Sequence, residues 1–436
     1  MSSRSRLLSV VVAALCAVQP VASRAADELL ETLAQKGVIS MEDYEKLKAQ
    51  RKTAPTVITD DGFRIATGDG GWSVQVGALQ QLDLAAYKDD KIDLADGTEM
   101  RRSRLSAAGT FLKDWQYRVE YEFATSSAAL TDAYVTYNAY KPVLVTLGQF
   151  KPPFGMEALS QDKSATFMER ALPFYLVSPV VVRAPGAMLS SSGTNWSAAG
   201  GIFGEPIGNA QSGDEGYGAA ARMSFAPLFT GSRIVHLGLS GQWRDPTQDN
   251  SSNTTGQKFD TVRFRAKPES NILAQRFVDT GELTDVKRYT FAGVEFAAQV
   301  DALSLQSEYQ QVSVKRGAPA NLDFDTWYAQ LAYTLTGEAR PYRVDRGVFE
   351  GIKPAKNFAR GAGWGAFEVA ARISELDLTD GPVNGGRERN ATAAVSWYLN
   401  PFLRVSANYV KVLDVKGGAF DGEEPSVWQM RLQIAI

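Results

Sequence analysis

Strict alternation of apolar and polar residues is the dominant pattern of this chain. In WQYRVEYEF, residues 115–123, every second residue from Trp115 is aromatic or apolar, and the residues between them are Gln, Arg and Glu. A period of two places these two sets on opposite faces of an extended strand. The pattern recurs, bounded by Gly, Asp, Asn or Pro, at 72–84, 217–225, 235–243, 327–335, 391–399, 403–409 and 428–436. The sequence therefore predicts an all-β protein of many strands.

Two features of these strands favour a membrane barrel over a soluble sandwich. Their polar faces are rich in charge, and some apolar faces are small, as at Ala391 and Ala393, where a soluble core would hold large side chains. Aromatic residues also gather at strand ends, as at Trp115 and Phe123, which is typical of the two interface girdles of a membrane barrel. A soluble all-β domain remains the alternative.

Chain length sets the expected size of the barrel. After residue 26 no apolar run approaches 18 residues, so no membrane-spanning helix is predicted. About 375 residues follow position 61, and at roughly 20 to 25 residues per strand with its connections they provide about 16 strands. Barrels of that size enclose a water-filled lumen. We therefore expect a transmembrane antiparallel β-barrel over residues 61–436.

The first 26 residues have the pattern of a signal peptide. Arg4 and Arg6 precede the apolar stretch 7–18, which is too short to span a bilayer, and small residues suited to cleavage lie at 23–26. Bulky Leu15 before Cys16 disfavours a lipoprotein. The protein is therefore expected to be exported.

Residues 27–60 depart from the alternating pattern. Leucines at helical spacing occur on both sides of Gly37, and Ser40 can cap a second helix with Asp43 at the capping-box position. We expect a short periplasmic helical segment and linker ahead of the barrel. A role in trimer contacts and a solvated leader without a partner are both open.

Composition restricts the possible chemistry. The chain contains 46 Lys and Arg against 49 Asp and Glu, one cysteine and one histidine. One cysteine allows no internal disulfide, and His236 alone offers little for a zinc site. We expect no cofactor, no metal and no nucleic-acid partner. The formal net charge of −3 does not reveal which ions the protein prefers.

The segment KFDTVRFRAKPES, residues 258–270, carries a cation at every second position: Arg263, Arg265 and Lys267. In an extended chain these side chains would line one face about 7 Å apart, from a rise of about 3.3 Å per residue. Rings and rows of Arg or Lys are a recurring device in anion pores. A solvated surface loop is the alternative.

Several further blocks resemble the phosphate-selective porin O and P family. They occur in order from the first strands to the last, and together they cover nearly the whole expected barrel. The blocks are RRSRLSAAGTFLKDWQYRVEYEF (101–123), TDAYVTY (131–137), LGQFKPPFGMEAL (147–159), YAQLAYTLTGEAR (328–340), SWYLN (396–400) and NYVK (408–411).

The resemblance implies a homotrimer of 16-stranded outer-membrane barrels, each with loops folded into its lumen. It also implies a ladder of arginines leading anions, phosphate or polyphosphate among them, to a constriction with a phosphate-binding lysine. Matched by position, the implied constriction residues are Lys163, Arg101, Arg102 and Asp132, and the implied ladder residues are Arg263, Arg265 and Lys267. Arg104, Arg118 and Arg222, on predicted interior faces, are expected to contribute to the field of the lumen.

Two departures from the family pattern bear on selectivity. Ala78 stands where the family often has an arginine, and Lys267 offers a point charge where the third ladder residue is a forked guanidinium. A general diffusion porin with weak anion preference is therefore one alternative function. An outer-membrane hydrolase is another, but Ser240 lies about 13 Å along the strand from His236, too far to be activated by it.

Overall fold

The fold is described from a computed structural model. The structure describes residues 31–46, 55–59, 62–124, 128–181, 183–205, 207, 215–246, 261–318 and 320–436. The expected signal peptide, residues 1–26, lies outside the described residues. Among the described residues no helix combines the length and the hydropathy needed to cross a membrane.

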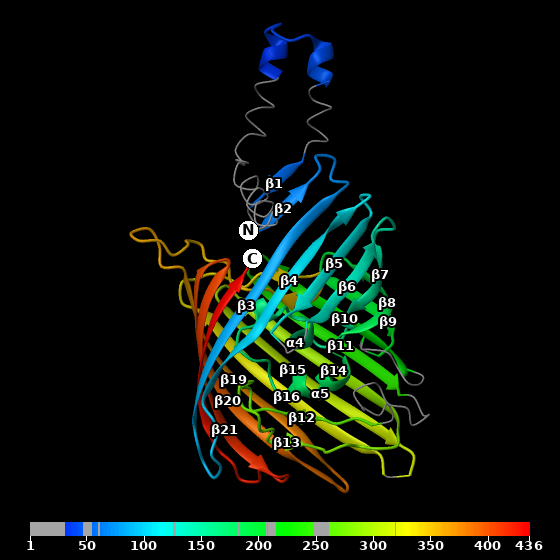
Figure 1. Ribbon diagram of the computed structural model, residues 1–436, viewed down its shortest axis with the longest axis vertical. Helices are drawn as coiled ribbons and strands as arrows, with labels where there is room; N and C mark the ends of the chain where they lie inside the picture. Colours follow the sequence, from blue (N-terminus) through cyan, green and yellow to red (C-terminus); the bar gives the residue numbers. More distant parts are fainter. Residues whose placement is uncertain are drawn as a thin grey trace, which may run out of the picture. The chain divides into compact units, whose positions relative to one another are not determined.

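Sixteen antiparallel strands form a closed barrel, as the sequence predicted (Figure 1). The ring closes where β22 pairs with β3, with Trp428 opposite Ala86 and Leu432 opposite Leu82. The strands are β3 (Ser73–Lys88), β4 (Gly97–Phe111), β5 (Trp115–Glu122), β6 (Ala129–Tyr137), β7 (Val143–Phe150), β8 (Ala184–Ser192), β9 (Trp196–Phe203), β10 (Tyr217–Thr230), β11 (Arg233–Asp245), β14 (Val286–Val300), β15 (Leu303–Arg316), β16 (Leu322–Thr334), β19 (Ala366–Asp380), β20 (Val383–Asn400), β21 (Leu403–Lys416) and β22 (Ser426–Ala435).

The alternation along the strands separates an apolar outer face from a polar inner face. In β10, Met223 is 64% exposed, while Arg222 and Ser224 on either side are buried. In β22, exposed Trp428 and Met430 alternate with buried polar residues. A soluble protein would bury such an apolar face, whereas a membrane barrel turns it to lipid.

The N-terminal part contains the expected helices and one unexpected hairpin. Helices cover 31–35 and 41–46, and Ser40 Oγ accepts the amide hydrogen of Asp43 at 3.0 Å, so the predicted cap is confirmed. The linker before residue 60 was expected to be helical or coiled, but β1 (Thr56–Ile58) is a strand. It pairs with β2 (Phe63–Ala66), which in turn pairs with the start of β3. The β-branched residues of TVI favour this extended conformation.

The connections between strands differ in length at the two ends of the barrel. At one end several are tight turns, such as 231–232, 301–302 and 401–402. The long turn, residues 335–365, is an exception at that same end, and it contains β17 (Tyr342–Arg343) and β18 (Val348–Phe349).

Two long connections at the opposite end fold into the barrel. The first inward loop, residues 151–181, contains α4 (Met156–Leu159), the 3₁₀ helix η1 (Asp162–Ser164) and α5 (Pro173–Val181). The second inward loop, residues 261–285, contains β12 (Arg265–Ala266) and β13 (Val278–Asp279). Figure 1 shows α4, α5, β12 and β13 within the ring of strands.

Apolar packing holds these segments against the wall and against one another. Phe154 and Leu172 of the first inward loop share a buried cluster with Phe264 of the second and with Phe291 of β14. Met156 packs in another buried cluster with residues of the long turn and the wall. The three segments therefore narrow the interior of the barrel.

Candidate functional site

The first inward loop is held in place by buried arginines that donate to its backbone carbonyls. The acceptors lie within residues 164–169, and the donors come from the long turn and from three strands, β19, β21 and β22. The pairs are Arg340 with Ser164 O (3.2 Å), Arg404 with Ala165 O (2.7 Å), Arg431 with Met168 O, and Arg372 with Glu169 O (3.1 Å). These arginines therefore position the loop.

Asp162 in η1 gathers three more arginines. Its carboxylate lies 2.6 Å from Arg104, 2.9 Å from Arg170 and 3.3 Å from Arg102. Burial alone would raise the pKa of Asp162, but the charges of Arg102, Arg170 and Arg104 together hold that pKa well below its usual range. Arg104 also pairs with Glu122 at 2.8 Å. Arg102, expected at the constriction, and Arg104, expected to contribute to the field of the lumen, are thus largely neutralised by these carboxylates.

Arg101 and Glu169 form a two-point ion pair, with hydrogen bonds of 2.8 and 3.0 Å. Arg431 also binds Glu169, at 2.7 Å. Burial would raise the pKa of Glu169, but Arg101 and Arg431 hold that pKa below its usual range. Unlike the buried Arg102, Arg101 keeps 21% of its side chain exposed.

A break in strand alternation lets Arg101 and Arg102 both reach interior partners. Met100 and Leu105 are five positions apart, and yet both are exposed on the outer face, at 46% and 52%. Strict alternation would place them on opposite faces, so one extra residue interrupts the period between them. Strict period-two reasoning from the sequence would have sent one of the two arginines outward.

The remaining expected residues lie in three different settings. Lys163 is half-buried in η1, and Gln433 donates to its carbonyl at 3.1 Å. Asp132 in β6 binds Arg183 at 2.7 Å. Arg118, in β5, is half-buried.

Arg222 in β10 connects the wall to the long turn. It forms a two-point ion pair with Glu295 (2.8 and 2.6 Å) and donates to Gly347 O at 2.8 Å. Arg222, expected to contribute to the lumen field, is thus neutralised and anchors the long turn.

The expected ladder residues lie in the second inward loop, where Lys267 is half-buried. Phe264 and Ala266 are fully buried in the apolar cluster, whereas Arg263 and Arg265 between and beside them are exposed. Arg263 forms a two-point ion pair with Asp279 at 2.7 and 2.5 Å.

Arg276, which the sequence pattern does not indicate, lies near Arg263 and Arg265 because β13 pairs with β12. Burial lowers the pKa of Arg276, and the nearby charge of Arg265 lowers it further. Within the described part of the chain, neither Arg265 nor Arg276 has a side-chain hydrogen bond or ion pair. We call Arg263, Arg265, Lys267 and Arg276 the basic cluster. Arg276 has no periodic relation to the others, so no local signal could have identified it.

The single histidine is enclosed by the wall and the long turn. His236 is fully buried, with Nδ1 2.6 Å from the Tyr342 hydroxyl and Nε2 3.1 Å from Glu295. Ser240 Oγ instead accepts from the Gly155 amide at 3.4 Å. Among the residues that the structure describes, His236 therefore has an acidic and a phenolic partner and no serine partner.

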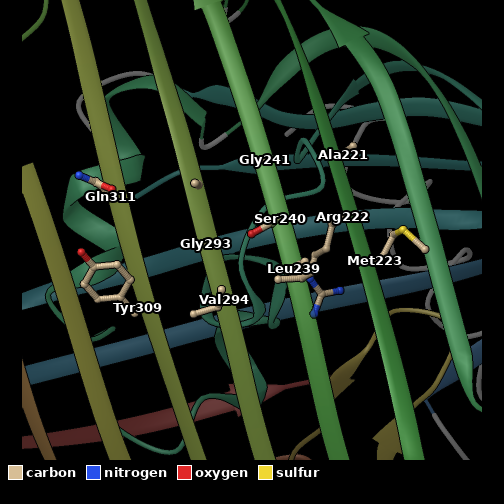
Figure 2. Close-up of a pocket in the computed structure, with 11 residues that line it drawn as sticks. Ala221, Arg222, Met223, Leu239, Ser240, Gly241, Gly293, Val294, Tyr309 and Gln311 are labelled. Atoms are coloured by element: carbon tan, nitrogen blue, oxygen red, sulfur yellow. The ribbon is translucent and has the colours of Figure 1, made fainter. Parts of the chain in front are cut away.

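An apolar depression lies on the outer face of the wall over β10, β11, β14 and β15 (Figure 2). The cross-strand pair Ala221 and Gly241 leaves space beside the exposed side chains of the pair Met223 and Leu239. Because it is on the apolar outer face, this depression is separate from the basic cluster.

The family model for phosphate-selective porin O and P matches residues 74–436. The chain belongs to this family. It is 27% identical to Porin O of Pseudomonas aeruginosa over 394 residues, covering 81% of this chain and 86% of that protein. It is 31% identical to an uncharacterized protein of Caulobacter vibrioides, covering 85% of this chain and 74% of the other.

Solved porin structures share the fold at low sequence identity. OmpT of Vibrio cholerae with loop L8 deleted superposes with a TM-score of 0.52 at 11% identity, covering 84% of this chain and all of the other. An anion-selective porin from Comamonas acidovorans gives a TM-score of 0.50 at 14% identity, with the same coverage. Family membership makes this protein a porin of the bacterial outer membrane, a channel and not an enzyme.

Proposed function

We propose that this porin conducts anions past the basic cluster, with phosphate and related oxyanions as preferred substrates. The observation that carries the proposal is the pair Arg265 and Arg276. Neither guanidinium group has an ion pair among the described residues, and on this loop inside the barrel Arg265 is exposed and Arg276 is half-buried. Charge of one sign in a low-dielectric passage concentrates counter-ions and replaces part of their hydration.

The chemistry of arginine supports oxyanions in particular. A guanidinium presents a planar fork that matches two oxygens of a phosphate or sulfate, and Lys267 adds a point charge. The family description, phosphate-selective porin O and P, supports this preference. In the proposal Arg101 and Lys163 form the inner end of the route, beyond the basic cluster.

The second candidate function is a general diffusion porin with weak anion preference. The ion pairs that arginines of the proposed anion route form with carboxylates favour this function. Arg263 is paired with Asp279, and Arg101 with Glu169. Such pairing reduces the positive potential available to a passing anion.

Reversal potentials of the purified porin in a KCl gradient test the proposal. The wild type is expected to prefer chloride over potassium, and the double variant Arg265→Ala, Arg276→Ala is expected to lose most of that preference. Arg233→Ala removes an exposed arginine at the opposite end of β11 and serves as the matched control. Cation preference in the wild type would contradict the proposal.

Substrate competition separates the two candidates. In a phosphate-preferring channel, millimolar phosphate should block the chloride current. In a general diffusion porin, phosphate should leave the chloride current intact and add a current of its own.

We also propose that the porin assembles as a homotrimer whose apolar outer face contacts outer-membrane lipid. Large exposed residues on that face, such as Leu239 and Val294, support the lipid contact. A trimeric form has been solved for OmpT of Vibrio cholerae. Native mass spectrometry in detergent gives the number of chains directly.

A further inference from the structure

An acidic side chain stands beside the basic cluster and bridges the wall to the second inward loop. Glu99 precedes Arg101 by two residues on β4, and Met100 between them is exposed on the outer face. Both carboxylate oxygens of Glu99 accept hydrogen bonds from Asn271 Nδ2, at 3.0 and 2.8 Å. Arg101 Nε lies 4.0 Å from the same carboxylate.

Exposure distinguishes Glu99 from the other carboxylates that bind Arg101 and its neighbours. The Glu99 side chain is 25% exposed, whereas that of Glu169 is 2% exposed and that of Asp83 is 3% exposed. Glu169 and Asp83 are also both bound by Arg431. Glu99 is therefore an acid that a passing ion can sense.

The cation that Glu99 faces across Asn271 is Lys267. The Lys267 ammonium donates to the Asn271 carbonyl, and the Asn271 amide donates to Glu99. Burial lowers the pKa of Lys267 and so does Arg276, while Glu99 counteracts them. Glu99 therefore acts on two cations, Lys267 across Asn271 and Arg101, which is paired more closely with Glu169.

A carboxylate acts on each part of the basic cluster. Asp279, which pairs with Arg263, also acts on Arg265 and Arg276, whereas Glu99 acts on Lys267. A conducting site must attract an ion and also release it, and a fixed like charge beside the site promotes release. The repulsion grows in proportion to the charge of the passing anion.

We propose that Glu99 is a specificity-determining residue, a fixed counter-ion that weakens anion binding at Lys267 and Arg101 and does so more for dianions than for monoanions. The inference rests on the proposed anion conduction. By this proposal, Glu99 shortens the time for which divalent oxyanions stay bound at the inner end of the basic cluster.

Single-channel recordings of the purified porin in planar bilayers test this assignment. Conductance is measured against concentration for sulfate, which stays divalent across neutral pH, and for chloride. Glu99→Gln removes the charge and keeps one of the two side-chain oxygens that accept from Asn271. Its half-saturation concentration is expected to fall about three- to tenfold for sulfate and clearly less for chloride, with lower maximal sulfate conductance.

Two further variants separate charge from contact and from a general field. Glu99→Asp keeps the charge and should stay near the wild type, so an Asp variant that behaves like the Gln variant would overturn the proposal. Asp93→Asn removes an equal charge from the exposed connection between β3 and β4 and should leave sulfate affinity nearly unchanged. An equal effect of both charge-removing variants would also overturn it.

Failure of the inference can be told apart from failure of the proposed function. A wild type without anion preference in a KCl gradient refutes the proposed function. A wild type that prefers anions, with the same sulfate and chloride half-saturation in Glu99→Gln, refutes the role of Glu99 alone. Because recordings report only inserted, conducting channels, a folding defect lowers the number of events and not the measured affinity.

Discussion

At the scale of single residues, the cations of this porin differ in what they bind. Arg102 and Arg104 are held by Asp162, and Arg372 and Arg431 hold the first inward loop. By contrast Arg265 has no ion pair among the described residues. Effects of substitution should therefore follow pairing more closely than charge.

Lys163 and the exposed arginines should respond differently to salt. Exposed charges are screened with a Debye length of about 10 Å at 0.1 M, and partly buried charges are screened less. Lys163→Ala should therefore weaken phosphate binding at every salt concentration, by about tenfold if a charge-assisted hydrogen bond is lost. Arg263→Ala with Arg265→Ala should lower conductance mainly at low salt. Single-channel conductance at 50 mM and 1 M salt checks both, and unchanged anion conductance in all three variants at 50 mM would contradict the assigned route.

Asp162→Asn should loosen the first inward loop. The change keeps the shape but leaves three neighbouring guanidinium groups without their shared carboxylate, a loss of about 3 to 5 kcal/mol for a broken buried pair. Hydrogen exchange of loop amides should rise, while exchange in β14 and β15 stays at the wild-type level. A loop as protected as in the wild type would contradict this role.

The same carboxylate sets the pH response of the loop. The pKa of Asp162 is lowered in the folded state, so its contribution to stability is complete above its ordinary pKa and is lost only as pH falls through the lowered value. The loop should therefore keep its exchange protection at pH 4. Loss of protection between pH 6 and pH 4 would contradict this sign.

At the scale of elements, contacts of several kinds hold the long turn inside the barrel. Arg222 donates to its carbonyls, Tyr342 contacts His236, and Val348 packs near Met156. Replacing residues 342–363 by a two-residue turn, which keeps Arg340 and its hydrogen bond to the first inward loop, should vacate part of the interior. Single-channel conductance should rise while the anion preference stays, because the basic cluster lies on another loop. Unchanged conductance would mean that the turn does not restrict the route.

At the scale of the whole molecule, the barrel is closed by its own strands and should not need the N-terminal helices. β22 pairs with β3 from Ala435 to Ser426, and the helices cover only 31–46 of the described residues. A chain lacking residues 27–54 should insert and conduct with wild-type single-channel conductance. Trimer yield measured in parallel shows whether the helices contribute to assembly. Failure of the shortened chain to form channels would contradict independent folding of the barrel.

Local pattern was sufficient for much of this architecture. Alternation over 217–225 predicts a strand with Met223 outside and Arg222 inside, since strand side chains alternate. The Ser40 cap and the exposure of Arg263 and Arg265 on either side of buried Phe264 also follow from neighbours in sequence. In each case the residues that interact are a few positions apart, so their geometry is fixed by the conformation of one element.

Only the tertiary structure decided which charges are cancelled and which remain. Glu169 and Arg431 are 262 positions apart, and Asn271 and Glu99 are 172 apart. The interrupted alternation that turns both Arg101 and Arg102 to interior partners, and the return of β13 that brings Arg276 to Arg265, depend on how distant strands and loops pack. An ion pair between distant segments leaves no periodic trace in the chain, because its two partners meet only after the barrel has closed and the loops have folded into it.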